Sequence, residues 1–579
     1  MEIAANSPNK TSHRLIFIFS IVILLTLLKF FVIVKPTGPS IFKDELYYKQ
    51  YAQQIFRGEY LTDSGYPPFY PLLLSPAFFF SNWYNAMIWI NKILSSLSLI
   101  PIWFLARKYL SKDMAAIVVL LAAMSPYQLI YPTYILSENL SIGLFILGLV
   151  FSVSGVRKTN YAQSLLLGLV LALCYLTKYL FLPAIPVIII FWFFINKLES
   201  GQKLFNFERN DWVKLLLVGL AIIVPILLWK IYSAKSGFTS NEALGLFYFG
   251  KKSPNITLIS LLKWILSYSA YALLASAPFL IFLLLRYQSV IKNFPKSKRI
   301  GKEDSFLVLA LILSLGYWLI AIQHSFGANY NYPIPQYLIG RYMAHITPLY
   351  IICGLLAIET IFKNRNTNTK QLRLSAVIAA ISIILARWLL YGDNSLGFAE
   401  NFASIYFNSP DSIVYKVLPV LLIGIFCLIL MSYSLWKYIK KDTSHNYKRI
   451  VLIILFLWQS CTFSMISKSV LNFSLGLHGR YIAKAVENQA ENSEIYFDID
   501  SISNLRLFYM LRFWEADVPY KGIHKISPKE EFDILESPEK DFILVTNTLY
   551  NYCESEHYEA DGLTYHIYEI SEDCLPTNN

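Results

Sequence analysis

The stretch LIFIFSIVILLTLLKFFVIVKPTGPSIFKDEL (residues 15–46) joins a long apolar run directly to a pair of acids. The run, residues 15–34, is long enough to cross the hydrocarbon core of a bilayer as a helix. It is longer than the apolar core of a signal peptide and no small-residue cleavage pattern follows it, so we expect a retained first span. Asp44 and Glu45 then lie within a few residues of the membrane. The question is what two neighbouring carboxylates do at this position.

The rest of the chain repeats this apolar pattern. Of its 579 residues, 55% are hydrophobic and 15% are charged, whereas soluble chains carry about 25% charged residues. The composition predicts an all-α polytopic membrane protein with about thirteen transmembrane helices. The expected spans are 15–34, 84–106, 114–131, 135–155, 162–179, 180–196, 213–232, 259–286, 305–323, 343–362, 374–390, 413–436 and 450–467.

The net charge of +12 divides into two opposite parts. Residues 1–467 hold 41 bases and 18 acids, and residues 468–579 hold 9 bases and 20 acids. The basic excess belongs to loops between spans and therefore does not indicate nucleic-acid binding. We expect residues 1–467 to form the transmembrane domain and residues 468–579 to form a small extracytoplasmic α/β domain.

The loop charges also predict an orientation in the plasma (inner) membrane. Bases gather in alternate loops, which by the positive-inside rule places the N-terminus in the cytoplasm and the loop 35–83 and the C-terminal domain outside. In that domain, 494–500 and 541–546 read as strands and 504–514 as a helix. An oxidising compartment would allow Cys553 and Cys574 to form a disulfide. The remaining cysteines, expected as small apolar residues in spans, are Cys174, Cys353, Cys427 and Cys461.

The first outer loop combines a helix pattern with an aromatic–proline run. Residues 42–58 read as an amphipathic helix lying on the outer membrane surface. The run Tyr66-Pro67-Pro68-Phe69-Tyr70-Pro71 cannot continue a regular helix, so we expect it to turn the chain back toward the second span. This arrangement would hold Asp44 where both lipid and water can reach it.

Few charges lie at membrane depth on the outer side, and these are the candidate site residues. A carboxylate at this depth costs free energy unless it is paired or faces water. Three carboxylates are placed this way: Asp44, Glu45 and Glu138 (in YPTYILSENLSIGLF). The structural alternative is an interfacial ion pair, or for Glu138 a helix start capped by Ser137. Lys178 and Arg341 read either as interface anchors or as ligands of a lipid phosphate. His324 opens an aromatic–polar loop (324–342) suited to stacking on sugars.

These residues resemble motifs of the GT-C superfamily of integral-membrane glycosyltransferases, in particular the branch of lipid A aminoarabinose transferases and protein O-mannosyltransferases. The resemblance rests on the acids after the first span, YPPFYPLLLSP, LSENL, LTKYLFLPAIP and the GRY…P element. It implies transfer of a sugar from a polyprenyl-phosphate donor, with Asp44 as general base and Glu45 and Glu138 orienting the acceptor or organising the site. Relatives often carry His where this chain has Tyr66, and the chain has no WWD signature, which argues against an oligosaccharyltransferase.

The chemistry of such a reaction agrees with this set of residues. An attacking hydroxyl must lose its proton, which one carboxylate can accept. A phosphate leaves without a general acid if cations such as Lys178 and Arg341 stabilise its charge. Tyr66, Tyr70 and His324 are the other expected substrate-binding residues, for the donor or for a lipid, glycan or protein acceptor. A divalent cation (Mg or Mn) held by Asp44, Glu45 and Glu138 is an open alternative.

Two other classes of function stay open at this point. A lipid or small-solute transporter or flippase often has internal repeats and acids at the bilayer midplane. This sequence shows no evident internal repeat, and its distinctive acids lie at the outer ends of spans. The third class is a non-catalytic assembly or binding protein that acts through its acidic C-terminal part. Substitution of Asp44 separates these alternatives from a transferase.

Overall fold

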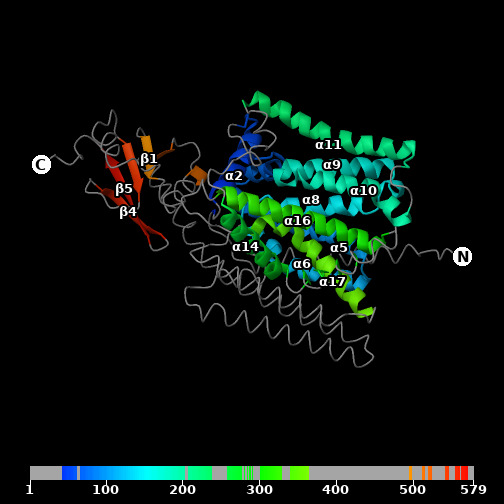
Figure 1. The fold of residues 1–579 in the computed structure, drawn as a ribbon. Coiled ribbons are helices and arrows are strands. Elements are labelled where there is room, and N and C mark those ends of the chain that lie inside the picture. Colours follow the sequence, from blue (N-terminus) through cyan, green and yellow to red (C-terminus); the bar gives the residue numbers. More distant parts are fainter. Residues whose placement is uncertain are drawn as a thin grey trace, which may run out of the picture.

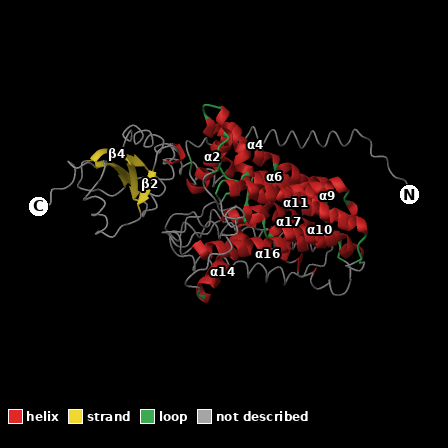
Figure 2. Cartoon of the chain, turned by 90° about the horizontal axis from the view of Figure 1, so that it is seen from above, coloured by secondary structure: helices red, strands yellow, loops and turns green. Residues whose placement is uncertain are grey.

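The computed structural model describes residues 39, 42–61, 66–201, 206–237, 257–276, seven residues between 279 and 290, 300–328, 340–363, 494–498, 512–514, 520–523, 542–546, 554–560 and 563–570. Figure 1 shows a body of long helices that run side by side, with a small sheet beyond the end that carries helix α2. Figure 2 shows the same two parts from above, with the strands set apart from the helices.

The helical part is built from α-helices joined by short 3₁₀ turns. Their bounds are α2 Phe42–Arg57, α3 Phe69–Leu74, η1 Ser75–Phe79, α4 Trp83–Leu97, α5 Leu99–Arg107, α6 Lys112–Ala123, α7 Pro126–Leu129, η2 Tyr131–Thr133, α8 Glu138–Ser152, η3 Val156–Lys158, α9 Tyr161–Thr177, η4 Tyr179–Phe181, α10 Ala184–Ser200, α11 Arg209–Lys235, α14 Leu258–Ser276, α16 Lys302–Ala328, η5 Gly340–Tyr342, η6 Ala344–Ile346 and α17 Thr347–Lys363.

Among the described residues, four helical stretches are long and apolar enough to cross a membrane. They are Trp83–Arg107, Arg209–Lys235, Lys302–Ser325 and Gly340–Thr360. Each contains or closely matches an expected span, so the chain is a multi-pass membrane protein. The expected spans 135–155, 162–179 and 180–196 correspond to the apolar helices α8, α9 and α10. The expected span 259–286 overlaps α14, which runs from Leu258 to Ser276. The predictions for 15–34, 374–390, 413–436 and 450–467 lie outside the described residues.

The expected span 114–131 is not one straight helix. Helix α6 ends at Ala123, and the chain bends by 70° into α7 and η2. Buried polar side chains accompany the bend. The Gln128 side-chain amide donates to the Ser98 hydroxyl (2.6 Å), and the Ser95 hydroxyl donates to the Gln128 side-chain oxygen (3.0 Å). Because a buried amide must satisfy its donors and acceptors, these bonds favour the bent path over a straight apolar helix.

The helix predicted over 42–58 is present as α2, but its environment differs from a simple surface helix. Tyr48 and Tyr51 are buried, whereas Phe56 is 39% exposed. The aromatic–proline run that follows turns the chain and also begins the short helix α3. Pro71 occupies the first turn of that helix, where proline costs no hydrogen bond.

Helices α8, α9, α10, α14, α16 and α17 surround the main apolar core. Helix α9 packs on α8 on one side and on α11 on the other. The α9–α11 approach needs Gly168, because a Cβ there would lie 2.5 Å from the carbonyl oxygen of Val218. Small residues allow such close backbone contact between membrane helices. Helix α9 thus connects the two ends of the bundle, and its ends carry the two polar regions described next.

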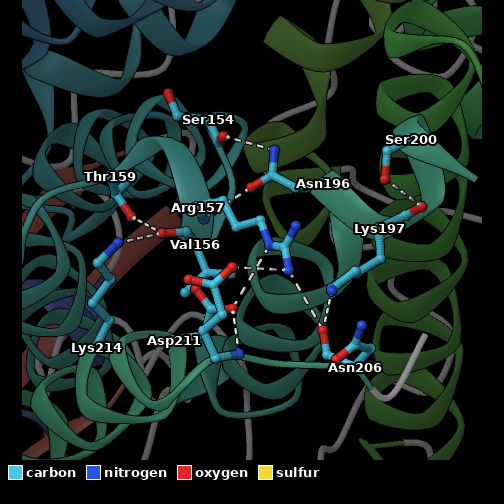
Figure 3. Close-up of polar contacts among 11 residues, drawn as sticks. Ser154, Val156, Arg157, Thr159, Asn196, Lys197, Ser200, Asn206, Asp211 and Lys214 are labelled. Atoms are coloured by element: carbon cyan, nitrogen blue, oxygen red, sulfur yellow. Dashed lines mark hydrogen bonds and ion pairs between the residues drawn. The ribbon is translucent and has the colours of Figure 1, made fainter. Parts of the chain in front are cut away.

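At the N-terminal end of α9, polar side chains tie the loop after α8 to α10 and α11 (Figure 3). We call this set the Arg157 junction; it comprises Ser154, Val156, Arg157, Asn196, Lys197, Asn206, Glu208, Asp211 and Lys214. The Asn196 side chain accepts from the Arg157 amide (3.0 Å) and donates to the Ser154 carbonyl (3.2 Å). The Arg157 guanidinium lies near Asp211 (3.7 Å), in the first turn of α11. The junction therefore holds the end of α10 and the start of α11 in place.

The strands form one mixed sheet in the order β2-β1-β3-β5-β4. Strand β1 pairs in parallel with β2 and β3, while β5 pairs antiparallel with β3 and β4. The bounds are β1 Glu494–Asp498, β2 Tyr520–Ile523, β3 Phe542–Thr546, β4 Glu554–Ala560 and β5 Leu563–Ile570.

Two strands predicted from the sequence, over 494–500 and 541–546, are present as β1 and β3. Of the predicted helix 504–514, the described residues 512–514 are helical. The Cys553–Cys574 pairing and the domain boundary at 467/468 fall outside the described residues and stay predictions.

Candidate active site

Five polar side chains from separate parts of the chain meet at the C-terminal end of α9. Asp44 lies in the first turn of α2 and Glu138 in the first turn of α8, where the helix dipole favours negative charge. Lys178 follows the last residue of α9, and Arg341 lies in η5. Tyr66 precedes α3. We call these five residues the Asp44 cluster.

Opposite charges alternate through the Asp44 cluster. The Arg341 guanidinium forms an ion pair with the Asp44 carboxylate through Nη1, and its Nε lies 3.9 Å from Glu138 Oε1. The Lys178 ammonium donates to the same Glu138 oxygen (2.5 Å). The order along the contacts is therefore Asp44, Arg341, Glu138, Lys178, with each acid next to a base.

The two carboxylates differ in how much solvent reaches them. The Glu138 side chain is 1% exposed, and the Asp44 side chain is 18% exposed. A buried charge is tolerated only when it is paired, which explains why Glu138 has both cations beside it. Asp44 is the carboxylate that an incoming molecule can reach.

Asp44 is held at both of its oxygens. Tyr66 donates its hydroxyl hydrogen to Oδ1 (2.7 Å), and Arg341 binds Oδ2. Burial by itself raises the pKa of Asp44, but the Arg341 charge and the Tyr66 hydrogen bond outweigh it and hold the pKa below the ordinary value of 3.8. In this arrangement Asp44 is ionised at neutral pH.

Tyr342 adds an aromatic surface beside both cations. The Lys178 ammonium lies 5.4 Å and the Arg341 guanidinium 5.8 Å from the centre of its ring. The His324 ring, from α16, lies 4.6 Å from the same ring. His324 is thus near the Asp44 cluster as expected, with Tyr342 between them. The loop 329–339 is outside the described residues.

Two predicted site residues serve packing instead. Glu45 is fully buried and accepts a hydrogen bond from the backbone amide of Ile135 (3.0 Å). Tyr70 is fully buried, and its hydroxyl donates to the Asn91 side chain (2.8 Å). The expectation that Tyr70 contacts substrate is therefore corrected: an aromatic in a proline-rich loop resembles an exposed residue, but α3 buries it.

The structure also bears on the divalent-cation alternative. Within the described part of the chain, no group of three His, Cys, Asp or Glu side chains is placed to hold a metal ion. The set Asp44, Glu45 and Glu138 fails as a ligand set because Glu45 binds a backbone amide while the other two are neutralised by cations. We derive no step through a metal.

Two neighbours of the cluster, Ser141 and His345, were not found from the sequence, and a third, Ser137, was expected only as a helix cap. Ser137 occupies the N-cap position of α8, but its hydroxyl accepts from Tyr48 (2.9 Å) and lies 3.4 Å from the Glu138 carboxylate. One turn further into the bundle, His345 Nε2 lies 2.9 Å from the Ser141 hydroxyl. These residues join α2, α8 and η6 behind the charges. The only signal in the sequence was helical spacing, with Ser141 three residues after Glu138 and His345 four after Arg341.

Residues 66–229 match the family model described as dolichyl-phosphate-mannose-protein mannosyltransferase. That range includes three residues of the Asp44 cluster: Tyr66, Glu138 and Lys178. A comparison with curated proteins finds no match.

Two solved structures resemble the whole chain. One is ArnT from Cupriavidus metallidurans bound to undecaprenyl phosphate, with a TM-score of 0.54 and 12% identity over 98% of this chain and 100% of that chain. The other is ArnT from the same organism in the apo state, with a TM-score of 0.51 and 13% identity over 96% of this chain and 98% of that chain. The chain is therefore a multi-pass membrane protein with the fold of ArnT, and over residues 66–229 it is similar to the family described as dolichyl-phosphate-mannose-protein mannosyltransferase, in line with the resemblance that its motifs carry.

Proposed function

We propose that this protein is a glycosyltransferase that moves a sugar from a polyprenyl-phosphate-linked donor to a hydroxyl group of a lipid, glycan or protein acceptor. The observation that carries the proposal is the Asp44 cluster, in which a partly accessible carboxylate lies beside two cations. The matching family model names a dolichyl-phosphate-linked donor, and one similar structure holds undecaprenyl phosphate. Both support a lipid phosphate as the donor's leaving group.

Asp44 is the general base in this proposal. The acceptor oxygen forms a bond to the anomeric carbon of the sugar while the acceptor proton passes to the Asp44 carboxylate. The bond between that carbon and the phosphate oxygen breaks, and its electron pair leaves with the phosphate. Base and leaving group lie on opposite faces of the sugar, so the configuration at the anomeric carbon inverts.

Arg341 and Lys178 stabilise the departing phosphate. A guanidinium binds two phosphate oxygens at once, and an ammonium adds a compact positive charge. Because the phosphate leaves as an anion, these charges replace the general acid that a poorer leaving group would need. Glu138 keeps the two cations in place through its own contacts with both.

This assignment gives the Asp44–Arg341 ion pair a role before catalysis. In the structure Arg341 holds down the pKa of Asp44, which makes the carboxylate a weak base. A donor phosphate that draws Arg341 toward itself frees Oδ2 and raises the pKa of Asp44. The base then gains strength when the donor is bound.

The remaining predicted residues have supporting roles. Tyr66 orients Asp44 through its hydroxyl, and Tyr342 with His324 forms an aromatic wall for the sugar. Glu45 anchors α2 to the chain before α8 rather than binding the acceptor. The reaction is assigned to the extracytoplasmic face of the plasma membrane, with the N-terminus in the cytoplasm, on the loop charges alone.

The test is a reconstitution that separates transfer from transport. Purified protein in vesicles receives a polyprenyl-phosphate donor with a labelled sugar, together with a membrane extract as acceptor source. The proposal predicts one free polyprenyl phosphate for each labelled product, with inverted configuration. A transporter or flippase would move intact donor across the bilayer without cleaving it, and that result would refute the proposal. Protein-free vesicles are the control.

A further inference from the structure

One residue of the C-terminal region lies inside the core that supports α2. Phe513 is fully buried, in a short helical segment formed by residues 512–514. Its apolar cluster also contains Leu46 and Tyr48 of α2, and Tyr84 of α4. A side chain that is far away in the sequence therefore completes the packing beneath the helix that carries Asp44.

The contact is made by four aromatic rings, two from residues 513–514 and two from the start of α4. The Phe513 ring lies 5.7 Å from Tyr84, edge to face, and 5.5 Å from Trp83. Trp514 lies 5.6 Å from Trp83 and 5.5 Å from Tyr84. Aromatic pairs at these separations attract one another beyond the effect of area burial. We call these four rings the Phe513 contact.

The Phe513 contact reaches α2 directly. Lys49, on α2 and buried, places its ammonium 5.4 Å from the centre of the Trp83 ring. A desolvated cation over an indole ring is among the stronger contacts of this type. Tyr48, on the same helix, packs in the cluster with Phe513.

Helix α2 is also held by the chain that leads into α8. Glu45 accepts from the Ile135 amide, and Tyr48 donates to the Ser137 hydroxyl (2.9 Å). The position of Asp44 relative to Glu138 thus depends on two supports: these hydrogen bonds and the Phe513 contact. Arg341 and Lys178 are carried by other elements of the chain.

We propose that Phe513 is a positioning residue, through which the C-terminal region sets the placement of α2 and of Asp44 against the cations. The inference rests on the proposed function of Asp44 as general base. It gives the C-terminal region a part in catalysis that does not require it to touch the acceptor or the donor.

Truncation of Phe513 should alter the rate and leave donor binding alone. Phe513→Ala removes the ring that fills the core under α2, and displacement of a catalytic group by about 1 Å costs on the order of a hundredfold in rate. We expect kcat per folded molecule to fall at least tenfold, while the KM for the donor stays within about twofold because Arg341 and Lys178 lie on elements other than α2. Phe513→Leu, which retains apolar volume, should recover most of kcat.

The experiment compares wild type, Phe513→Ala, Phe513→Leu and Phe80→Ala by kcat, donor KM and amide hydrogen exchange of residues 42–57. Phe80 is 63% exposed and serves as the matched control, with kcat and exchange unchanged. Faster exchange of α2 with lower kcat in Phe513→Ala supports the inference. Unchanged kcat per folded molecule, or unchanged exchange of α2, overturns it.

The exchange measurement keeps this inference separate from the proposed function. If wild type transfers no sugar, the proposed function fails, and exchange of α2 still decides whether Phe513 holds that helix. If Phe513→Ala does not fold, Phe513→Leu takes its place, and faster exchange confined to α2 is then the supporting result. Exchange that rises equally in α8 and α9 would show general destabilisation and would overturn the inference.

Discussion

The Asp44 cluster and the Arg157 junction lie at opposite ends of α9, and both bury charged side chains, but they satisfy these charges differently. At the junction two of the cations bind the backbone: Lys214 donates to the Val156 carbonyl (2.9 Å), and Lys197 donates to the Asn206 carbonyl. The third, Arg157, lies near the Asp211 and Glu208 carboxylates. In the Asp44 cluster both cations, Lys178 and Arg341, form ion pairs with carboxylates.

This difference separates a structural from a functional use of charge. A cation bound to backbone carbonyls cannot leave without disturbing the chain path, and so it holds loops in place. A cation bound to a side-chain carboxylate can exchange it for a ligand phosphate while the backbone stays fixed. The junction is also locked by Gly155, whose φ of 73° favours glycine. The four predictions below test this comparison, from the largest expected effect to the smallest.

Loss of Arg341 should have the largest effect on transfer. Arg341→Gln removes the charge assigned to the leaving phosphate, and loss of one such preorganised contact costs on the order of 10²–10³ in kcat. It also removes the main cause that lowers the pKa of Asp44, so that pKa should rise. Since transfer requires the carboxylate form, the acid limb of the pH profile of kcat/KM, which reports the free enzyme, should move to higher pH. A profile with an unmoved acid limb would contradict the assigned pairing.

Loss of Glu138 should destabilise the fold. Glu138→Gln leaves Lys178 buried without its carboxylate partner, which costs about 3 kcal/mol of the free energy of unfolding. The double variant Glu138→Gln with Lys178→Met should recover most of this loss, because no unpaired charge remains. Denaturation in detergent measures both. Additive losses in the double variant would show that the two residues do not act as a pair.

Loss of the Tyr66 hydroxyl should have a moderate effect. Tyr66→Phe keeps the stacked ring contact with Tyr47 (5.0 Å) but removes the hydrogen bond to Asp44. A hydrogen bond to a charged group contributes about 1.5–3 kcal/mol to stability, so the free energy of unfolding should fall by up to this amount. Because Tyr66 also orients Asp44, we expect transfer per folded molecule to fall roughly tenfold. Kinetics at fixed pH check this, and a wild-type rate would remove Tyr66 from the site.

Loss of Arg157 should affect stability alone and by the smallest amount. Its guanidinium is 29% exposed and lies near Asp211 and Glu208. Arg157→Gln should lower the free energy of unfolding by about 1 kcal/mol and leave kcat per folded molecule unchanged. A specific loss of kcat in this variant would break the distinction between the two ends of α9.

The members of the Asp44 cluster could be predicted from the sequence, but not their pairing. Asp44, Glu138, Lys178 and Arg341 each stand out as a charge at the edge of an apolar run. Which acid meets which base depends on contacts between segments far apart in the chain, and a single sequence holds no signal for these. The burial of Tyr70 was missed for the same reason, since local pattern does not show what covers a side chain.

The fold shows the same division between local and long-range information. Spans such as 84–106 and 213–232 follow from apolar length, a local property. The bend after Ala123 was missed because apolar residues continue through it, although Ser125 and Pro126 mark a break. Strands β1 and β3 were found from their apolar runs. The order of the five strands depends on long-range pairing that local patterns do not encode.

The most direct measurement makes the same substitution at both ends of α9. Asp44→Asn and Asp211→Asn each remove one negative charge at constant size, and single-turnover transfer is measured per folded molecule with donor already bound. We predict that Asp44→Asn folds and binds donor but transfers about a hundredfold more slowly or worse, the effect of losing a general base. Asp211→Asn should transfer at the wild-type rate with reduced stability. Full transfer by Asp44→Asn, or an equal loss in both variants, would contradict the account.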